Sequence, residues 1–255
     1  MTTMLDELMD TELDSEVRGK DTRVRIQTTD AAPHRFICQL EVDGEWWGSG
    51  TLIGPRTVLT AGHCLTDLSD NPLSKLRMRV IPGRNGKEED LGTSAVADFM
   101  PMPGYDDVSP TDVGIIQLKE RLGDKIGWWT AAHSQRKGDP HGTSFLTGAL
   151  PVPAGSLKVN LCGYPGDKPP GATAKTRGTV QYLAYDETVR KKDGMLYYEN
   201  DTYHGHSGSP VWVRRHASMG GRVLCGIHVG TDGGWNAAVF LDNKVRKFIT
   251  DKILK

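Results

Sequence analysis

Short apolar or alternating segments, separated by turn residues, run through almost the whole chain of 255 residues and restrict its fold more than any other feature. No amphipathic helical segment of about 10–15 residues alternates with them, which argues against a βαβ architecture. Residues 243–255, by contrast, place apolar side chains on one helical face. We therefore expect an all-β protein that ends in a helix, with strands at residues 35–41, 45–53, 78–80, 113–118, 156–162, 179–184, 195–198, 210–214, 223–229 and 237–241.

A serine flanked by glycines marks the candidate reaction centre. Ser207 lies between Gly205 and Gly208, directly before an apolar run of β type. Glycine lets the backbone turn sharply, so the N–H groups of Gly205 and Ser207 form a candidate oxyanion hole for a reacting carbonyl. A serine hydroxyl is a weak nucleophile alone, so the chain must also supply a base. We expect that a β-branched residue at position 205 damages turnover far more than stability.

A histidine and an aspartate meet this requirement. His63 follows the apolar run of residues 50–59, and Asp112 directly precedes another apolar strand. We assign His63 as the general base and Asp112 as the carboxylate that orients its imidazole. Asp106 and Asp107 are competing carboxylates, but their loop has the composition of a solvated segment. The chain order of histidine, aspartate and serine is that of the chymotrypsin class and differs from the subtilisin and α/β-hydrolase orders.

Five ordered segments carry a wider resemblance, and they are Gly54-Pro55-Arg56-Thr57-Val58, Ala61-Gly62-His63-Cys64, Pro82-Gly83-Arg84-Asn85-Gly86, Gly163-Tyr164-Pro165-Gly166-Asp167-Lys168 and Ser207-Gly208-Ser209-Pro210-Val211. Together they resemble the chymotrypsin-fold serine endopeptidases, and among these the bacterial glutamyl endopeptidases of bacilli and staphylococci. The resemblance implies two six-stranded antiparallel β-barrels with a C-terminal helix. Residues 17–125 would form the barrel with His63 and Asp112, and residues 126–255 the barrel with Ser207. It also implies peptide hydrolysis through an acyl-enzyme.

The resemblance further implies a pocket for a glutamate side chain, and less well for aspartate, before the scissile bond. In the family, a threonine five residues before the serine and a histidine on the pocket strand hold the substrate carboxylate; here these positions are Thr202 and His228. A hydroxyl and an imidazole supply hydrogen-bond donors without a full buried cation. His204, Val229 and Gly230 complete the candidate substrate-binding residues. Alternatively, Thr202 caps a turn and His228 is a satisfied core histidine.

Asp201 gives a competing specificity. It stands six residues before Ser207, where trypsin-like enzymes place the aspartate that binds Arg or Lys. Bacillar glutamyl endopeptidases resemble this chain in having Asp-Thr here, and the bulky His228 would crowd a long basic side chain, so we favour glutamate. A catalytically inactive protease-like binding module is the remaining alternative, and the intact triad argues against it.

The residues around the serine depart from the family pattern at two positions. His206 precedes Ser207, where relatives carry Asn or Gln and trypsin-like zymogens carry Asp, so activation cannot use the usual salt bridge to a new N-terminus. His204 replaces a glycine near the mouth of the pocket, where we expect it to add positive potential for acidic substrates. Two histidines without further ligands do not make a metal site, and we expect neither a metal nor a cofactor.

The four cysteines have no Cys-x-x-Cys spacing and do not predict a zinc site. An even count in a secreted-type fold suggests two disulfides. The hairpin turn at Asp43-Gly44 places Cys38 on the wall that approaches the turn after His63, which favours a Cys38–Cys64 bridge. Cys162 and Cys225 would then pair in the second barrel. Free buried thiols are the alternative.

Charge and hydropathy exclude two classes of partner. Thirty-one basic residues balance 32 acidic ones, so we expect no nucleic-acid partner. No run approaches 18 apolar residues, so we expect no membrane span.

Residues 1–16 are acidic and unlike a signal peptide, and we interpret them as a propeptide remnant or acidic arm, with a disordered terminus as the alternative. We expect a secreted monomer that cleaves proteins or peptides. We also expect it to be made as a zymogen, whose active form starts at Val17 after cleavage behind Glu16.

Overall fold

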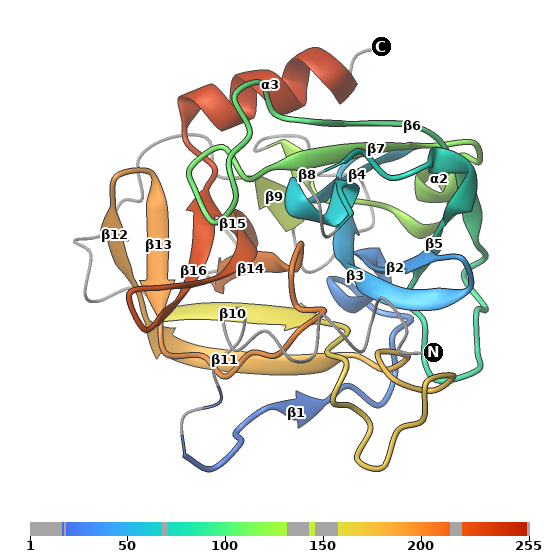
Figure 1. Ribbon diagram of the computed structural model, residues 1–255, viewed down its shortest axis with the longest axis horizontal. Helices are drawn as coiled ribbons and strands as arrows, with labels where there is room; N and C mark the ends of the chain where they lie inside the picture. The colour runs from blue at the N-terminus through green and yellow to red at the C-terminus, as the bar shows by residue number, and fades with distance from the viewer. Residues whose placement is uncertain are drawn as a thin grey trace.

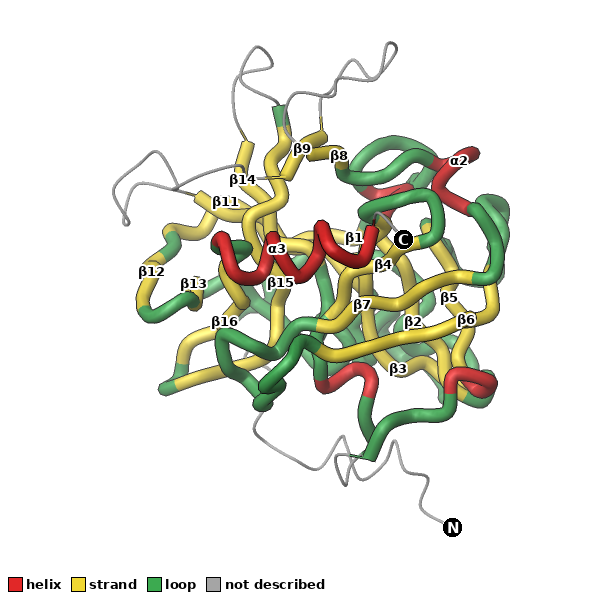
Figure 2. The backbone as a smooth tube through the Cα atoms, turned by 90° about the horizontal axis from the view of Figure 1, so that it is seen from above, coloured by secondary structure: helices red, strands yellow, loops and turns green. Residues whose placement is uncertain are grey.

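The computed structural model describes residues 17, 19–67, 71–131, 143–145, 158–214 and 221–253. Two β-units lie side by side, and helix α3 (Asn243–Ile253) lies across one end of the molecule (Figures 1 and 2). The last turn of α3 reaches the first unit, where Gln117 donates to the carbonyl oxygen of Lys252. This helix confirms the one predicted from the apolar face of the C-terminal segment. The acidic residues 1–16 lie outside the described residues.

The first unit is a closed barrel of six antiparallel strands, as predicted, in the order β2-β3-β4-β7-β6-β5. Its hairpin turn holds Asp43 and Gly44 at φ 55° and 82°, values of the tight turns that join antiparallel strands. The strands are β2 (Ile37–Val42), β3 (Glu45–Leu52), β4 (Thr57–Thr60), β5 (Met78–Pro82), β6 (Ser94–Pro101) and β7 (Gly114–Leu118).

The second unit is a ten-stranded sheet with the main path β1-β11-β10-β14-β15-β16-β13-β12, which differs from the six-stranded barrel that the resemblance implied. Strand β9 pairs in parallel with β8 and β15. The chain passes from β11, the second strand of this path, directly into β12 at its far end through Val189. The strands are β1 (Val24–Arg25), β8 (Thr130–Ala131), β9 (Thr143–Phe145), β10 (Lys158–Gly163), β11 (Tyr182–Thr188), β12 (Arg190–Lys192), β13 (Met195–Tyr198), β14 (Pro210–Arg214), β15 (Arg222–Asp232) and β16 (Trp235–Phe240).

The N-terminal strand β1 belongs to this second sheet. Val24 and Arg25 pair with Leu183 and Tyr182 of β11, although they precede the first barrel in the chain. The segment before β1 therefore runs along the second unit. Within the described ranges, four short helical segments connect the strands elsewhere, and they are η1 (His34–Phe36), η2 (His63–Leu65), η3 (Lys75–Arg77) and α2 (Leu122–Ile126).

Aromatic side chains join the two units into one core. The indole N–H of Trp46 on β3 donates to the carbonyl oxygen of Tyr164, at 2.7 Å across the junction. The rings of Trp129 and Trp212 are packed with their centroids 6.2 Å apart. One cluster of buried apolar residues extends through both units. The junction is therefore rigid enough to hold side chains from both units in a fixed arrangement.

All four cysteines are buried free thiols, so neither predicted disulfide forms. Strand β14 lies between β10, which carries Cys162, and β15, which carries Cys225. Strands two positions apart are separated by about 9–10 Å, beyond the Cα separation of about 7 Å that a disulfide can bridge. Cys38 directs its sulfur to the carbonyl oxygen of Phe36, and strand β3 separates it from β4, which leads to Cys64.

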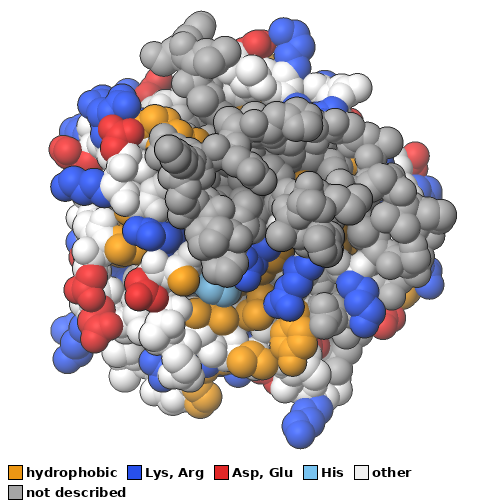
Figure 3. Space-filling model, turned by 180° about the vertical axis from the view of Figure 1, so that it is seen from behind, with side chains coloured by type: hydrophobic (Ala, Val, Ile, Leu, Met, Phe, Trp, Pro, Cys, Tyr) orange, Lys and Arg blue, Asp and Glu red, His pale blue; other side chains and the backbone are white. Residues whose placement is uncertain are grey.

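The distribution of surface charge and the composition of the helices relate to the nucleic-acid and membrane partners considered above. Basic and acidic side chains are interspersed on the face shown in Figure 3. No helix in the part of the chain that the structure describes has the length and apolar composition of a membrane span.

Candidate active site

Two paired strands bring His63 and Asp112 together. In the antiparallel pair of β4 and β7, Thr60 lies opposite Gly114. His63 follows Thr60 by one short turn, and Asp112 precedes Gly114 by two residues, so both emerge from the same end of the pair. Gly62 allows the close approach, because a Cβ atom there would lie 3.0 Å from Oδ1 of Asp112.

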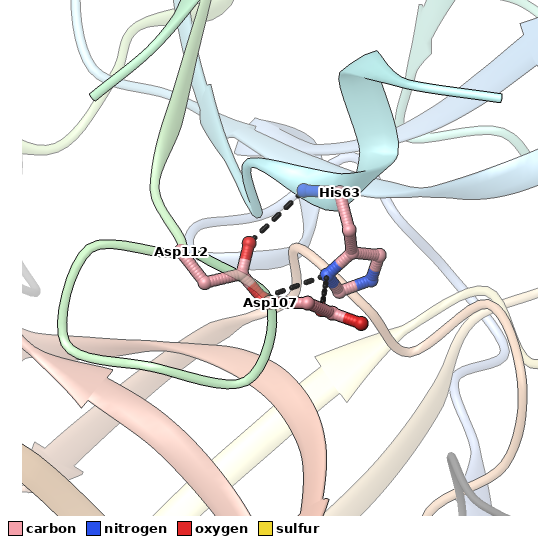
Figure 4. A group of neighbouring side chains, drawn as sticks. All are labelled: His63, Asp107 and Asp112. Atoms are coloured by element: carbon pink, nitrogen blue, oxygen red, sulfur yellow. Dashed lines mark hydrogen bonds and ion pairs between the residues drawn. The ribbon is translucent and has the colours of Figure 1, made fainter. Parts of the chain in front are cut away.

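The carboxylate of Asp112 holds His63 at two points (Figure 4). Its Oδ2 lies 2.8 Å from Nδ1 of the imidazole, and its Oδ1 accepts the backbone N–H of His63 at 3.0 Å. Asp112 is fully buried, and a buried carboxylate can only accept, so the proton of the neutral ring lies on Nδ1. Nε2 is thereby left as the basic nitrogen. This is the arrangement that the sequence predicted for a general base and its orienting carboxylate.

Asp107, which the sequence analysis named as a competing carboxylate and set aside, is a second carboxylate at the same nitrogen. Its Oδ1 lies 3.3 Å from Nδ1 of His63, and its side chain is 59% exposed whereas that of Asp112 is buried. Val108, at φ 44°, donates its N–H to both carboxylates. A β-branched residue rarely adopts this conformation. The solvated composition of the loop gave no sign of it.

The charges around His63 favour its protonated form. Burial by itself lowers the pKa of His63, but the charge of Asp112 and the hydrogen bonds to both carboxylates outweigh burial and raise that pKa well above its usual value. The hydrogen bond from His63 in turn lowers the pKa of Asp107. The ring can therefore accept a proton easily and hold it as a stabilised imidazolium ion.

Ser207 lies in a tight turn that both units fix. Its carbonyl oxygen accepts the N–H of Ser49 on β3 at 2.9 Å, and the next residue, Gly208, donates to the carbonyl oxygen of His228 on β15 at 2.8 Å. A Cβ atom on Gly48 would lie 3.1 Å from Sγ of Cys64 and 3.4 Å from the carbonyl oxygen of Ser207. The serine turn and the histidine turn thus flank one glycine. The Ser207 hydroxyl forms no hydrogen bond to a described side chain, which is common before substrate binds.

The turn before Ser207 holds two unused backbone donors. His206, Gly208 and Ser209 donate their N–H groups to carbonyl oxygens of the protein. The N–H groups of Gly205 and Ser207 have no acceptor within the described residues. Gly205, at φ 90°, is held from behind, because Ser49 donates its hydroxyl to the Gly205 carbonyl oxygen at 2.6 Å.

His206 shapes the same turn from inside. Its ring is fully buried, and Nδ1 accepts the backbone N–H of Tyr203 at 3.1 Å. Burial lowers the pKa of His206 well below its usual value, so the ring is neutral. His206 therefore closes the loop with a hydrogen bond, in the position where a zymogen's aspartate would need a charged partner.

The two predicted pocket residues are both buried and lie on neighbouring elements. Thr202 donates its hydroxyl to Oδ1 of Asn236 at 2.6 Å. His228 is fully buried, and its Nδ1 lies 2.8 Å from the hydroxyl of Tyr198. Its Nε2 has no partner among the described residues. Burial and the charge of His63 lower the pKa of His228 to about 3, so the ring is neutral. Asn236 and Tyr198 escaped the sequence analysis, since neither stands in a motif.

The remaining predicted pocket residues lie close to these two in the chain. Val229 is the extra residue of a β-bulge between His228 and Gly230 on β15, which bends the strand at this point. The partly exposed ring of His204 contacts the ring of Tyr203 edge-on, with centroids 5.5 Å apart.

Asp201 does not stand as a free carboxylate. Its Oδ2 accepts both the backbone N–H and the hydroxyl of Thr22, each at 2.7 Å. The side chain is nearly fully buried. This contact disfavours the predicted alternative in which Asp201 binds a basic substrate side chain.

Among the described residues, one group of three side chains has ligand atoms close enough for a metal ion, and it is His63, Asp107 and Asp112. Here the two carboxylates already accept hydrogen bonds from the His63 turn. His204 and His206, considered as a pair from the sequence, do not belong to such a group.

The structure combines a closed barrel packed against a second β-unit with a carboxylate-bound histidine beside a serine turn at their junction. This combination defines the class of chymotrypsin-like proteins. The solved structure of a Glu endopeptidase in complex with MPD has the same fold, with a TM-score of 0.72 and 24% identity over 94% of this chain and 100% of that one. The Trypsin family model matches residues 24–240. The chain belongs to the trypsin family.

Two curated relatives show which proteins of the family the chain is similar to. The chain is 32% identical to the glutamyl endopeptidase of Bacillus licheniformis over 227 residues, 88% of this chain and 63% of that protein. It is 28% identical to the extracellular metalloprotease of Bacillus subtilis over 253 residues, 95% of this chain and 71% of that protein. The chain thus spans a little under two thirds of the first relative's length.

Proposed function

We propose that the protein is a serine endopeptidase that cleaves peptide bonds through an acyl-enzyme. Ser207 is the nucleophile, His63 the general base and Asp112 the carboxylate that orients it. The observation that carries this proposal is the two-point hold of Asp112 on His63, which leaves Nε2 as the basic nitrogen. The glutamyl endopeptidase names of several relatives support it.

The chemistry proceeds in two balanced steps. His63 Nε2 takes the proton of Ser207 as its oxygen attacks the substrate carbonyl, and then gives that proton to the leaving amine. The N–H groups of Gly205 and Ser207 donate to the oxyanion, and each such donor lowers the barrier by about 3–4 kcal/mol. Water then attacks the ester carbonyl while His63 takes its proton. The bond from the acyl carbon to the Ser207 oxygen breaks, His63 returns the proton to that oxygen, and the carboxylic acid product leaves. The two carboxylates stabilise the imidazolium that forms in both steps.

The preferred residue before the scissile bond is glutamate, and aspartate is cleaved more slowly. The hydroxyl of Tyr198 lies 2.8 Å from Nδ1 of His228. In this proposal it donates to that nitrogen, so that the proton of the neutral ring lies on Nε2. That unpartnered N–H in a dry site is a suitable donor for a substrate carboxylate. The Thr202 hydroxyl, which donates to Oδ1 of Asn236 without substrate, turns to the substrate carboxylate as the second donor in this proposal. His204, Val229 and Gly230 form the surroundings of the bound side chain.

Reporter peptides that differ in one residue test the specificity. Peptides with Glu, Asp, Gln and Arg before the cleaved bond should be hydrolysed in the order Glu, Asp, then the other two. Faster cleavage of the Arg peptide would favour the Asp201 alternative. EDTA at millimolar concentration should leave the rate unchanged, because the His63, Asp107 and Asp112 side chains act through protons; loss of activity restored by a metal would contradict this mechanism.

The protein is a secreted monomer in this proposal, and it acts on proteins or peptides with no nucleic-acid or membrane partner. One relative is named extracellular, which supports secretion. Cleavage behind Glu16 would produce an active form that starts at Val17. N-terminal sequencing of active material tests this start, and full activity of a chain that retains Met1 would contradict it.

A further inference from the structure

The segment of residues 21–23 binds the loop that leads to the serine turn, although it lies near the other end of the chain. Thr22 donates both its N–H and its hydroxyl to Asp201. Asp201 is only 3% exposed, and a carboxylate buried to this degree requires donors. The position of Thr22 is set by strand β1, which begins at Val24 and pairs with β11.

Arg23 anchors the segment with a buried ion network. Its side chain is 1% exposed and lies 2.8 Å from Oδ2 of Asp21, while both its terminal nitrogens bind Asp167. Lys168 completes the network at 2.7 Å from Asp21. The Arg23 guanidinium also lies 6.0 Å from the ring centroid of Tyr203. Two cations and two carboxylates thus join the segment to residues 167 and 168, beside the loop that carries Asp201.

A pocket that binds a carboxylate at this place must offset the negative charge of Asp201. Asp201 is the neighbour of Thr202 in the chain, and a bound glutamate side chain between Thr202 and His228 would experience its negative charge. The neutral His228 offers no compensating cation. Like charges in a buried site repel strongly unless donors or cations offset them. The two donors of Thr22 contribute to that offset at Asp201, and the ion network of Arg23 holds their segment in place.

We propose that residues 21–23 are part of the specificity site, in which Thr22 binds and offsets the charge of Asp201 and Arg23 holds Thr22 in place, so that the pocket accepts an acidic side chain. The proposal rests on the proposed function, because it concerns the substrate preference of the same site. Thr22 and Arg23 act through Asp201 and are positioning residues. Neither needs to touch the substrate.

The test compares Glu and Gln reporter peptides, which differ in charge and hardly in shape. Thr22→Val removes one donor to Asp201 and keeps the shape of the side chain. The ratio of kcat/KM for Glu over Gln should fall about three- to tenfold, and the relative rate for Arg should rise. Thr28→Val, an exposed threonine of the same N-terminal segment, is the matched control and should leave the ratio unchanged.

Asp201→Asn separates charge from shape. In that background the carboxylate is absent, so Thr22→Val should no longer change the Glu over Gln ratio, a non-additive result. A purely structural role predicts equal losses for both peptides in every variant, with no change in the ratio. Arg23→Gln is the second variant and should lower the ratio as well. Any loss of folding there is monitored by thermal unfolding and cancels in the ratio.

A failure of this proposal and a failure of the proposed function give different results in these assays. If the unmodified protein prefers Glu over Gln but Thr22→Val and Arg23→Gln leave the ratio unchanged, the role of residues 21–23 is wrong and the proposed function stands. If the unmodified protein does not distinguish the two peptides, the glutamate specificity itself is wrong.

Discussion

The backbone N–H of His63 and its ring nitrogen Nδ1 bind the two oxygens of the same buried carboxylate, that of Asp112. Because one oxygen holds the main chain and the other the ring, the imidazole cannot rotate without losing a buried hydrogen bond. The tautomer and the orientation of the ring are therefore set before substrate arrives. Such preorganisation is what a general base needs.

Asp112→Asn should lower kcat about 10³–10⁴-fold, because the amide no longer enforces a proton on Nδ1. The amide oxygen can still accept the backbone N–H of His63, so folding should be retained. Steady-state kinetics with a Glu reporter and a thermal melt check both points. Asp106→Asn, six residues earlier in the same loop, is the control and should retain nearly full activity.

Asp107→Asn should move the acid limb of the kcat/KM profile to lower pH. His63 must be neutral to act as a base, and the carboxylate of Asp107 raises the pKa of His63. Removing it lowers that pKa, and the shift should be small because so exposed a carboxylate is screened by solvent. Asp112 and His228 also face the ring and remain in the variant.

Ionic strength provides the check on this assignment. Salt screens the exposed Asp107, so the acid limb of the unmodified protein should also move to lower pH at about 1 M salt. The Asp107→Asn variant should show a smaller salt effect. An acid limb that stays in place in the variant would mean that Asp107 does not act on the base.

Gly205→Ala should damage both turnover and stability. Gly205 has φ 90°, and a Cβ atom there would lie 2.5 Å from the carbonyl oxygen of Tyr164 and overlap the ring of Trp46. We expect a loss of about 2–4 kcal/mol in the free energy of unfolding. These contacts argue against the sequence-based expectation that a β-branched residue at position 205 damages turnover far more than stability. Gly171→Ala is the control, with φ 73° but open space around it, and should cost about 1–2 kcal/mol.

Stability should fall as pH drops below about 6.5, because two buried histidines are neutral in the folded protein. The pKa of His206 lies well below the usual 6.5 and that of His228 at about 3. Between those values and 6.5 the unfolded state binds more protons, and each ring contributes a slope of up to about 1.4 kcal/mol per pH unit. The raised pKa of His63 acts mainly above pH 6.5 and adds little slope below it, because the ring is then protonated in both the folded and the unfolded state.

Urea unfolding between pH 7 and pH 4.5 measures that slope. His206→Asn should flatten it by up to one proton, because one buried neutral ring is gone. His204→Asn, which changes a partly exposed ring two residues earlier, should leave the slope as it is. Equal slopes in all three proteins would show that the His206 ring does not titrate on unfolding.

His63 and Asp112 could be predicted from the sequence because each directly continues a strand. Strands β4 and β7 pair, so residues at the same end of the pair meet. Asp107 could not be placed in this way, because its approach to His63 depends on the left-handed backbone of Val108. Composition predicts a solvated loop and says nothing about such a turn.

The other predictions are limited by contacts between residues that are far apart in the sequence. The contact of Thr22 with Asp201 joins residues 179 positions apart, and no local pattern reports it. The disulfide predictions failed for a similar reason, since they depended on which strand lies between two others. The order of the second sheet, with β14 between β10 and β15, sets that separation.

Covalent labelling of Ser207 tests the central claim most directly. A fluorophosphonate probe reacts with a serine that a neighbouring base activates and that an oxyanion hole faces. We predict stoichiometric labelling at Ser207 by peptide mass mapping, none in Ser207→Ala, and strongly slowed labelling in His63→Ala. A folded protein in which Ser207 stays unlabelled, or is labelled equally fast without His63, would contradict the account.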